Sequence, residues 1–264
     1  MIHGVADPDD PRIAAYRDIR ERDLVGRQGL FVAEGRVVLA MLLASTRFAA
    51  RSLLIAAHRV AALADLIARV PDGVPVYAAG QPVLDAIAGF PLHRGILAIG
   101  ERREPSSADA LLASLPERAT VVALSGIANH DNMGGIFRNA AAFGADAVVM
   151  DGDCCDPLYR KAIRVSVGAV LTVPFVTLAA GEDLVGMLQA HWFDVLALSL
   201  TGERMLDGVV PGPRTALLFG AEGQGLPAAM VSRATGVRIP MAAGFDSLNV
   251  ATTSGIVLHH VMGR

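Results

Sequence analysis

The chain has 264 residues, of which 53% are hydrophobic, and its formal net charge at pH 7 is −3. This length allows one large or two modest domains with a real core. The longest apolar run, Val37–Ala44, is far shorter than the roughly 20 residues of a membrane span, and the acidic N-terminus does not resemble a signal peptide. The sequence therefore predicts a soluble, cytoplasmic protein rather than an integral membrane protein.

The charged residues and the cysteines limit the function further. The negative balance argues against a protein that coats nucleic acid non-specifically. The cations are 22 arginines and one lysine, Lys161; a guanidinium binds phosphate well and stacks on bases, so an RNA partner is permitted. The only cysteines, Cys154 and Cys155, are adjacent, which favours neither a structural disulfide nor a zinc site.

Residues 12–100 alternate short apolar runs with helical patterns, which predicts a small α/β domain. We expect helices over 33–45, 59–70 and 82–89, and strands over 51–57, 74–79 and 94–100. The polar segment 101–118, which contains Pro105, is predicted to be a linker with one or two turns of helix.

The same alternation returns in residues 119–264. We expect strands over 120–127, 145–152, 171–179, 193–200 and 237–241, a strand leading into a loop over 215–227, and helices over 134–144, 156–170, 182–192 and 249–263. This order predicts five or six mostly parallel strands with covering helices. In open sheets of this kind, ligands bind where the strands end.

Polar residues follow the first strand of this second block, in the stretch "NHDNMGGIFRNAAAFG". Arg138 would lie in the first or second turn of the helix, where the positive end of the helix dipole disfavours a cation. Such a position is a candidate for function. A capped helix with an incidental arginine explains the stretch equally well.

Two later stretches have the same character. In "LLFGAEGQGLP", three glycines surround Glu222 and allow the backbone to approach a ligand, although the stretch is neither a dinucleotide fingerprint nor a P-loop and glycine-rich turns are common. In "GFDSLNVATTSGIVL", Asp246, Ser247 and Asn249 precede an apolar helix. Helix capping is the commoner reason for such residues there.

Taken together and in this order, the stretches resemble the SpoU (TrmH-like) family of RNA ribose 2′-O-methyltransferases, of the SPOUT class. The family pattern N-x-G-x-x-x-R is similar to Asn132, Gly134 and Arg138, and its glycine-rich and I-P-M…SLNV motifs are similar to "LLFGAEGQGL" and "IPMAAGFDSLNVA". "DPLYRKAIRVSVGAV" also resembles the family, and "GLFVAEGRVV" and "HRGILAI" resemble its N-terminal domain. The likeness covers nearly all of residues 12–262.

The resemblance implies an α/β fold in which a mostly parallel C-terminal sheet with covering helices is tied into a trefoil knot, with a small N-terminal α/β domain like ribosomal protein L30e. The expected division is an RNA substrate-binding domain over 1–100, a linker over 101–118 and a methyltransferase domain over 119–264. Family members are usually homodimers that meet through their C-terminal domains.

The resemblance also implies the site. The cofactor would be S-adenosylmethionine, and no metal is required. The cofactor-binding residues would be Gly220, Ala221, Gly223, Ile239, Met241 and Leu248, and the catalytic residues Arg138, Asn132, Glu222, Ser247 and Asn249. Arg17, Arg20, Arg22, Arg27 and Arg36 are the candidate phosphate contacts, although a solvated face explains them equally well.

The implied reaction is methylation of a ribose 2′-hydroxyl in tRNA or rRNA. A guanidinium with a pKa above ~12 is normally only a donor, so Arg138 either orients an RNA phosphate by a bidentate contact or acts as base once its proton is drawn away. Two other functions stay open: a catalytically idle RNA-binding paralogue, and a knotted methyltransferase that acts on a base.

Overall fold

The computed structural model describes residues 2–17, 25, 28–88, 95–103, 107–244 and 247–263. The chain divides into two compact units. The first comprises Met1–Glu104 together with Leu158–Leu171, and the second comprises Pro105–Pro157 and Thr172–Arg264. The sequence predicted a continuous division at 100 and 119, so the return of Leu158–Leu171 to the first unit departs from that prediction.

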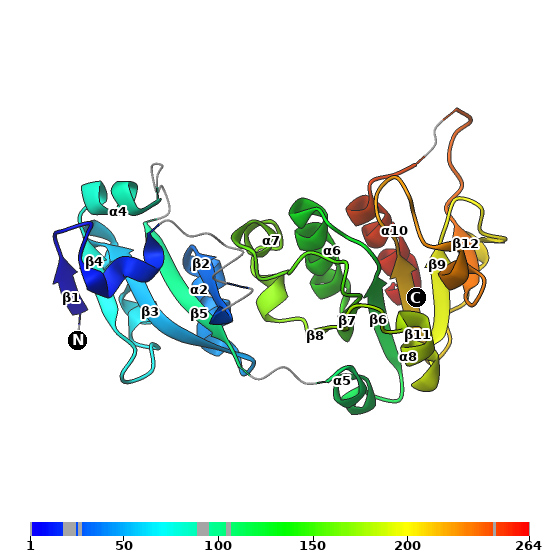
Figure 1. Ribbon diagram of the computed structural model, residues 1–264, viewed down its shortest axis with the longest axis horizontal. Coiled ribbons are helices and arrows are strands. Elements are labelled where there is room, and N and C mark those ends of the chain that lie inside the picture. Colours follow the sequence, from blue (N-terminus) through cyan, green and yellow to red (C-terminus); the bar gives the residue numbers. More distant parts are fainter. Residues whose placement is uncertain are drawn as a thin grey trace. The chain divides into compact units, whose positions relative to one another are not determined.

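The first unit is a five-stranded mixed sheet in the order β1-β4-β3-β5-β2 (Figure 1). Strands β1, β4 and β3 run parallel, whereas β5 pairs antiparallel with both β3 and β2. Its elements are β1 (Ile2–Val5), the 3-10 helix η1 (Pro11–Tyr16), β2 (Leu30–Glu34), α2 (Arg36–Ala44), β3 (Phe48–Ala56), the 3-10 helices η2 (Ala57–Arg59) and η3 (Ala61–Leu63), α3 (Ala64–Ile67), β4 (Val76–Ala79), α4 (Gln81–Ala88), β5 (Ile96–Arg102), α7 (Arg160–Val165) and the 3-10 helix η4 (Ala169–Leu171).

The three strands predicted in this unit are present as β3, β4 and β5, but three helix predictions need correction. The helix expected over 156–170 is divided into α7 and the 3-10 helix η4. The helix expected over 33–45 begins only at Arg36, because Leu30–Glu34 pairs with β5 as a buried strand. The helix expected over 59–70 is divided into η2, η3 and α3. Strand β1 was not predicted, since four residues are too few to carry a pattern.

The segment Leu158–Leu171 is fixed to the first unit by a buried ion pair. Glu34, which is only 6% exposed, accepts hydrogen bonds at Oε2 from Arg160 Nε (3.1 Å) and from the second guanidinium nitrogen (2.9 Å). A buried carboxylate without such a partner would be costly. The contact joins residues 126 positions apart, so local sequence patterns could not reveal it.

The second unit is a seven-stranded sheet in the order β10-β12-β9-β11-β6-β7-β8, and every pairing in it is parallel (Figure 1). The predicted five or six strands omitted β10, which has only two residues. The elements are α5 (Ala108–Ser114), β6 (Ala119–Leu124), α6 (His130–Phe143), β7 (Ala147–Met150), β8 (Phe175–Thr177), α8 (Leu184–Ala190), β9 (Asp194–Leu198), β10 (Arg204–Met205), the 3-10 helix η5 (Leu206–Gly208), β11 (Arg214–Phe219), α9 (Ala228–Val231), β12 (Thr235–Arg238) and α10 (Val250–Met262).

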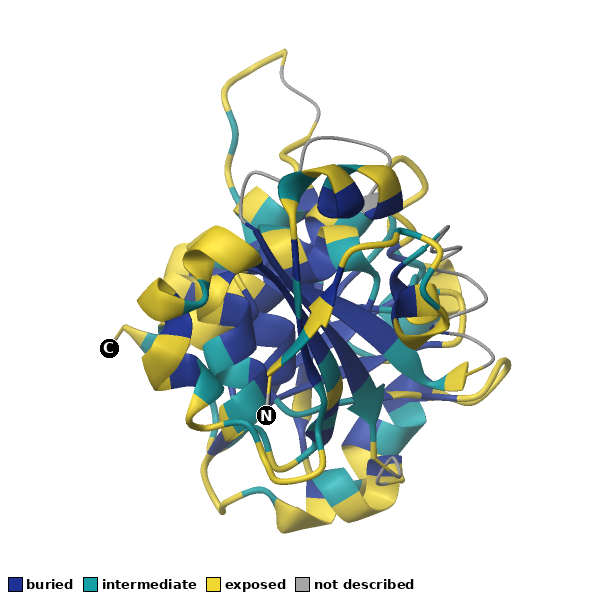
Figure 2. Cartoon of the chain, turned by 90° about the vertical axis from the view of Figure 1, so that its left-hand side faces the viewer, coloured by how far each residue is buried: buried dark blue, intermediate teal, exposed yellow. Residues whose placement is uncertain are grey.

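Helices cover both faces of this sheet. On one face, Leu112 of α5 and Leu188 of α8 pack against alternate strand residues such as Val121 and Ala123. Helices α6 and α10 lie side by side (Figure 1) and contact β7 and β11. Because both faces are covered, the strands are apolar throughout, as parallel strands usually are. The strands of the first unit, which face the viewer in Figure 2, are likewise buried along most of their length, whereas the outer sides of the helices are exposed.

A close contact between α6 and α10 positions the start of α10. A Cβ atom at Gly135 would lie 2.7 Å from the Cβ atom of Ala251, so only glycine permits this approach. Asn139 Nδ2 donates to the Ala251 carbonyl oxygen (2.7 Å) and to Ser254 Oγ (2.9 Å). The two helices are thereby fixed at the point where α10 begins. Within the part of the chain that the structure describes, none of the helices combines the length and apolar character that a bilayer crossing needs.

Candidate functional site

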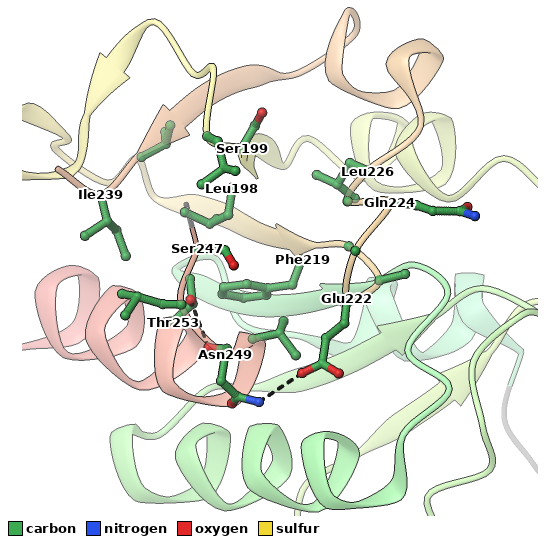
Figure 3. A pocket seen from close by; sticks show the side chains of 18 of the residues that line it. Leu198, Ser199, Phe219, Glu222, Gln224, Leu226, Ile239, Ser247, Asn249 and Thr253 are labelled. Carbon is green, nitrogen blue, oxygen red and sulfur yellow. Dashed lines mark hydrogen bonds between the residues drawn. The ribbon is translucent and has the colours of Figure 1, made fainter. Parts of the chain in front are cut away.

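Three neighbouring strands of the second unit end at one cavity. β12, β9 and β11 are adjacent and parallel, so their carboxyl ends meet at the same edge of the sheet. The segments that follow them enclose a cavity of about 550 Å³ (Figure 3). Its lining residues are Leu198, Ser199, Leu200, Phe219, Gly220, Ala221, Glu222, Gly223, Gln224, Gly225, Leu226, Val237, Ile239, Met241, Ser247, Leu248, Asn249, Val250 and Thr253.

The glycine-rich loop after β11 forms a tight wall of this cavity. Its backbone closes on itself through an antiparallel bridge, in which the Gly225 N–H donates to the Ala221 carbonyl oxygen (3.0 Å). A Cβ atom at Gly220 would lie 2.6 Å from the carbonyl carbon of Gly225 and from the amide nitrogen of Leu226. Backbone atoms cannot turn away as a side chain can. Position 220 therefore accepts only glycine in this conformation.

Asn249 makes two sets of hydrogen bonds, one that caps α10 and one that joins Asn132 to Glu222. As the N-cap of α10, its Oδ1 accepts from the backbone N–H groups of Ala251 (2.9 Å) and Thr252 (3.2 Å). Its Nδ2 donates to Asn132 Oδ1 (2.8 Å) and to Glu222 Oε1 (3.0 Å). Figure 3 shows the bond between Asn249 and Glu222 at the edge of the cavity. Because each amide atom has its own partners, the orientation of the side chain is fixed.

Asn132 and Glu222 complete this polar cluster from two other elements. Asn132 is 6% exposed and lies in the first turn of α6, whose N-cap is Asn129: Oδ1 of Asn129 accepts from the Asp131 N–H (2.8 Å) and, at 3.4 Å, from the Asn132 N–H. Among the described residues, Asn249 is the hydrogen-bond partner of the Glu222 carboxylate. The carboxylate keeps acceptor capacity for a hydroxyl group placed in the cavity.

The structure brings most of the predicted site residues together. Those that line the cavity are Glu222, Ser247, Asn249, Gly220, Ala221, Gly223, Ile239, Met241 and Leu248. Asn132 joins them through Asn249. The opening motif of the last helix therefore both caps the helix and lines a cavity; Asn249 makes the capping bonds and Ser247 lies on the lining, while Asp246 falls outside the described residues.

Arg138 is the exception. It lies on α6 and is exposed, it does not line the cavity, and it makes no hydrogen bond or ion pair with any residue that the structure describes. Of the arginines predicted to contact phosphate, Arg17 pairs with Asp9 and Arg36 with Asp65. The other three, Arg20, Arg22 and Arg27, lie outside the described residues.

Sequence patterns missed the contribution of β9. Leu198, Ser199 and Leu200 line the cavity because β9 lies between β11 and β12 in the sheet, and strand order is not visible in the sequence. Thr253 was missed for another reason. It lies one turn into α10, where its hydroxyl donates to the Asn249 carbonyl oxygen (3.0 Å), and its helical spacing from Asn249 was the available signal.

Neither a metal site nor a reactive thiol accompanies the cavity in the part of the chain that the structure describes. No group of three or more His, Cys, Asp or Glu side chains is placed to hold a metal ion there. Burial raises the pKa of the Cys154 thiol well above its usual value, and burial also raises the pKa of Cys155, to about 11. Both thiols are therefore neutral near pH 7.

We expect both cysteines to react slowly with iodoacetamide. A pKa of about 11 for Cys155 lowers its thiolate fraction at pH 8 by about 100-fold relative to an ordinary thiol, and the rate should rise as the pH approaches that value. Mass spectrometry of timed samples measures the rate, and the urea-unfolded chain provides the rate of the unprotected thiols. Rapid labelling of the folded protein at pH 8 would contradict this expectation.

Known proteins are similar to this chain over most of its length. The family model described as "SpoU rRNA Methylase family" matches residues 119–259. An uncharacterized tRNA/rRNA methyltransferase of Mycobacterium tuberculosis strain H37Rv is 41% identical, over 98% of this chain and 91% of that protein. A 23S rRNA (guanosine-2′-O-)-methyltransferase, RlmB, of Ralstonia nicotianae is 32% identical, over 70% of this chain and 76% of that protein.

A solved structure is similar along the whole chain. The AdoMet-bound rRNA methyltransferase of Sinorhizobium meliloti superimposes with a TM-score of 0.84 at 26% identity, covering 98% of this chain and 97% of that one. The similarity therefore includes both compact units.

Proposed function

Because the chain belongs to the SpoU rRNA Methylase family, we propose that it transfers a methyl group from S-adenosylmethionine to a ribose 2′-hydroxyl of tRNA or rRNA. The observation that carries the proposal is the convergence of three strand ends on a glycine-walled cavity beside the Asn249, Glu222 and Asn132 cluster. The 2′-O specificity of the RlmB relative supports ribose as the target. An RNA substrate implies that the protein works in the cytoplasm.

The residues of the cavity fit the proposed cofactor. A volume of about 550 Å³ lies within the usual range for small-molecule pockets, about 300–1,000 Å³. The loop at Gly220, Ala221 and Gly223 offers backbone groups at close range, and Ile239, Met241 and Leu248 offer apolar contacts for an adenine ring. When bound, S-adenosylmethionine supplies a methyl group activated by a sulfonium.

The polar cluster has the task of positioning the ribose. Asn249 holds the Glu222 carboxylate at the cavity edge through a hydrogen bond of 3.0 Å, and that carboxylate can accept a hydrogen bond from the target hydroxyl. Asn132 holds the Asn249 amide from the other side (2.8 Å). A hydroxyl group that is held in one orientation has already lost the freedom that it would otherwise lose in the transition state. Methyl transfer to it is therefore faster than to a freely rotating hydroxyl. Ser247 adds a second hydroxyl partner on the lining.

We propose that two copies of the protein form a homodimer through their second units, and that Arg138 acts at the cavity of the partner. Arg138 is exposed and unpaired with any described residue, and it does not line the cavity of its own chain. In the proposed dimer, Arg138 of one protomer lies beside the cavity of the other. There its guanidinium binds the phosphate next to the target ribose by a bidentate contact. Orientation is its proposed role, since a guanidinium holds its proton at neutral pH.

Two structural proposals accompany this function. We infer that the chain from β12 to α10 is threaded to close a trefoil knot. The position of β9 between β11 and β12 supports this inference, because it places the segments that follow all three strands around one cavity. We also infer that the first unit binds RNA and is related to ribosomal protein L30e. Its five-stranded mixed α/β sheet agrees with that relationship.

The experiment that tests the function is methyl transfer to RNA. The protein incubated with tritiated S-adenosylmethionine and total RNA from a strain lacking its gene should incorporate label into RNA. Arg138→Ala should lower the rate by about 100-fold, because the phosphate is no longer oriented. Binding of S-adenosylmethionine, measured by calorimetry, should be unchanged in that variant. A protein that binds RNA but transfers no label would be an idle paralogue, contrary to the proposal.

A mixing experiment tests the dimer separately. Arg138→Ala and Gly220→Ala should each retain about 1% of wild-type activity or less, but after subunit exchange an equal mixture should recover about one quarter of wild-type activity. Half of the dimers are then mixed, and each of these contains one complete site. If Arg138 served the cavity of its own chain, the mixture would stay inactive.

A further inference from the structure

The single tryptophan of the chain occupies an unfavourable backbone position. Trp192 follows the C-cap of α8, and its φ angle is +65°. The helix ends there with the Trp192 N–H donating to the Gln189 carbonyl oxygen (3.0 Å) and the Phe193 N–H donating to that of Leu188 (3.1 Å). Glycine is the usual residue at this position, since a side chain in the left-handed region is disfavoured. The helix ending therefore does not require tryptophan.

Packing does not explain Trp192 either, because 86% of its surface is exposed. Val210 is 80% exposed, and these two are the most exposed large hydrophobic residues in the described part of the chain. Both line one cavity of about 740 Å³ in the second unit. A strained backbone and an exposed ring at the same residue point to a contact outside the chain.

This cavity lies at the opposite edge of the sheet from the candidate site. It is bounded by the first residues of β9 and β12, Asp194 and Thr235, whereas the candidate site adjoins the last residue of β9, Leu198. Asp194 and Leu198 are four residues apart on β9, which at about 3.3 Å per residue corresponds to roughly 13 Å. A ligand at this second cavity does not reach the proposed methyl-transfer site.

The walls of the second cavity are polar. The polar side chains of its lining include Gln189, Asp194, Arg204, Ser232, Arg233 and Thr235. The Arg233 guanidinium is held by both carboxylate oxygens of Asp183 (2.9 and 2.8 Å). Arg204 is exposed and makes no ion pair with any residue that the structure describes. The cavity thus combines a flat aromatic ring, an unpaired cation and hydrogen-bonding groups.

We propose that this cavity holds an unpaired nucleotide of the RNA substrate, with its base stacked on Trp192 and its phosphate bound by Arg204; the identity of the ligand as RNA rests on the proposed function. Aromatic stacking platforms beside cations are the usual means of holding single-stranded RNA. Asp194 supplies a carboxylate acceptor for the base edge, and Gln189, whose Nε2 donates to the Arg233 carbonyl oxygen (2.8 Å), supplies its amide oxygen. A protein partner would need an apolar pocket that excludes water around the ring, and these polar walls do not provide one.

The test uses the fluorescence of Trp192, which is the only tryptophan in the chain and therefore reports on this cavity alone. The full-length protein is titrated with single-stranded oligouridylate and oligoadenylate of about 12 nucleotides, without S-adenosylmethionine. Saturable quenching of the emission is the expected result. Unchanged emission at RNA concentrations that bind the protein overturns the proposal. Emission that shifts to the blue with protein concentration alone also overturns it, and assigns the cavity to contacts between copies.

Variants separate stacking from stability. Trp192→Gly should weaken oligonucleotide binding, measured by the fluorescence anisotropy of an end-labelled oligonucleotide, by about 5- to 150-fold. Its melting temperature should not fall, because glycine suits the backbone there. Trp192→Phe, which keeps an aromatic face, should retain affinity within a few fold. Arg204→Ala should reduce the slope of log affinity against log salt concentration by about one, which corresponds to the loss of one phosphate contact. Arg204→Lys keeps the positive charge and should leave this slope unchanged.

The outcomes for the two proposals are distinguishable. If Trp192→Gly binds oligonucleotides as tightly as the wild type while the wild type methylates RNA, only the second-cavity proposal fails. If quenching and the variant effects are observed but no methyl group is transferred, only the proposed function fails. For an active enzyme, Trp192→Gly should raise KM and leave kcat unchanged, since the cavity is remote from the reacting atoms.

Discussion

Gly220→Ala is expected to abolish detectable S-adenosylmethionine binding. The added Cβ atom would lie 2.6 Å from two backbone atoms of the same loop, at Gly225 and Leu226, and neither can move without opening the bridge between Ala221 and Gly225. A displacement of about 1 Å in a positioning element costs on the order of 100-fold. Isothermal titration calorimetry of the purified variant measures the loss.

Gly208→Ala is the matched control. Gly208 lies in the same unit, at the end of η5, and an added Cβ atom there would meet no atom within 4 Å. This variant should bind S-adenosylmethionine like the wild type. If Gly220→Ala bound equally well, the loop after β11 would not form the wall of the cofactor site, and the assignment of the cavity would be wrong.

Asn249→Asp is expected to lower methyl transfer by about 100- to 1,000-fold, the range found when a single positioned donor is removed from an active site. Aspartate keeps the oxygen that accepts from the Ala251 and Thr252 N–H groups, so α10 remains capped. It loses the Nδ2 donor and places a carboxylate against Glu222 Oε1 and Asn132 Oδ1. Two acceptors that face each other repel, so the cluster opens.

Asn249→Ala separates the two roles of this residue. Alanine removes the cap as well as the donor, so the free energy of unfolding should fall by about 0.5–2 kcal/mol, whereas Asn249→Asp should retain most of it. Urea unfolding measures the difference, and the tritium assay measures transfer for both variants. Full activity in Asn249→Asp would show that the amide only caps the helix and that the cluster with Glu222 and Asn132 has no part in the reaction.

Much of the fold could be predicted because its elements carry local signals. The strands of the second unit are apolar runs bounded by turn residues, and the two long helices that border the site begin at asparagine caps, Asn129 and Asn249. Such signals depend on neighbours along the chain. The glycine-rich loop was recognised as a ligand-binding candidate for the same reason, since Gly220 directly follows an apolar strand.

What could not be predicted depends on contacts between distant residues. Strand order places Ser199 in the cavity, and the ion pair between Glu34 and Arg160 returns Leu158–Leu171 to the first unit. The sequence predicts a helix from residue 33 onward, whereas Leu30–Glu34 is a strand, because its pairing with β5 is not visible in the sequence. A role for Trp192 could not be predicted from the sequence, because its unusual features are its positive φ angle and the exposure of its side chain.

The position of the transferred methyl group distinguishes methylation of the ribose from methylation of the base. RNA labelled by the wild-type protein with tritiated S-adenosylmethionine is hydrolysed completely in alkali, which cleaves after every nucleotide with a free 2′-hydroxyl. For methylation of the ribose, the label is expected in alkali-resistant dinucleotides, because a methylated 2′-oxygen cannot attack the adjacent phosphate. Label recovered in mononucleotides, on the base, would contradict the proposed ribose methylation.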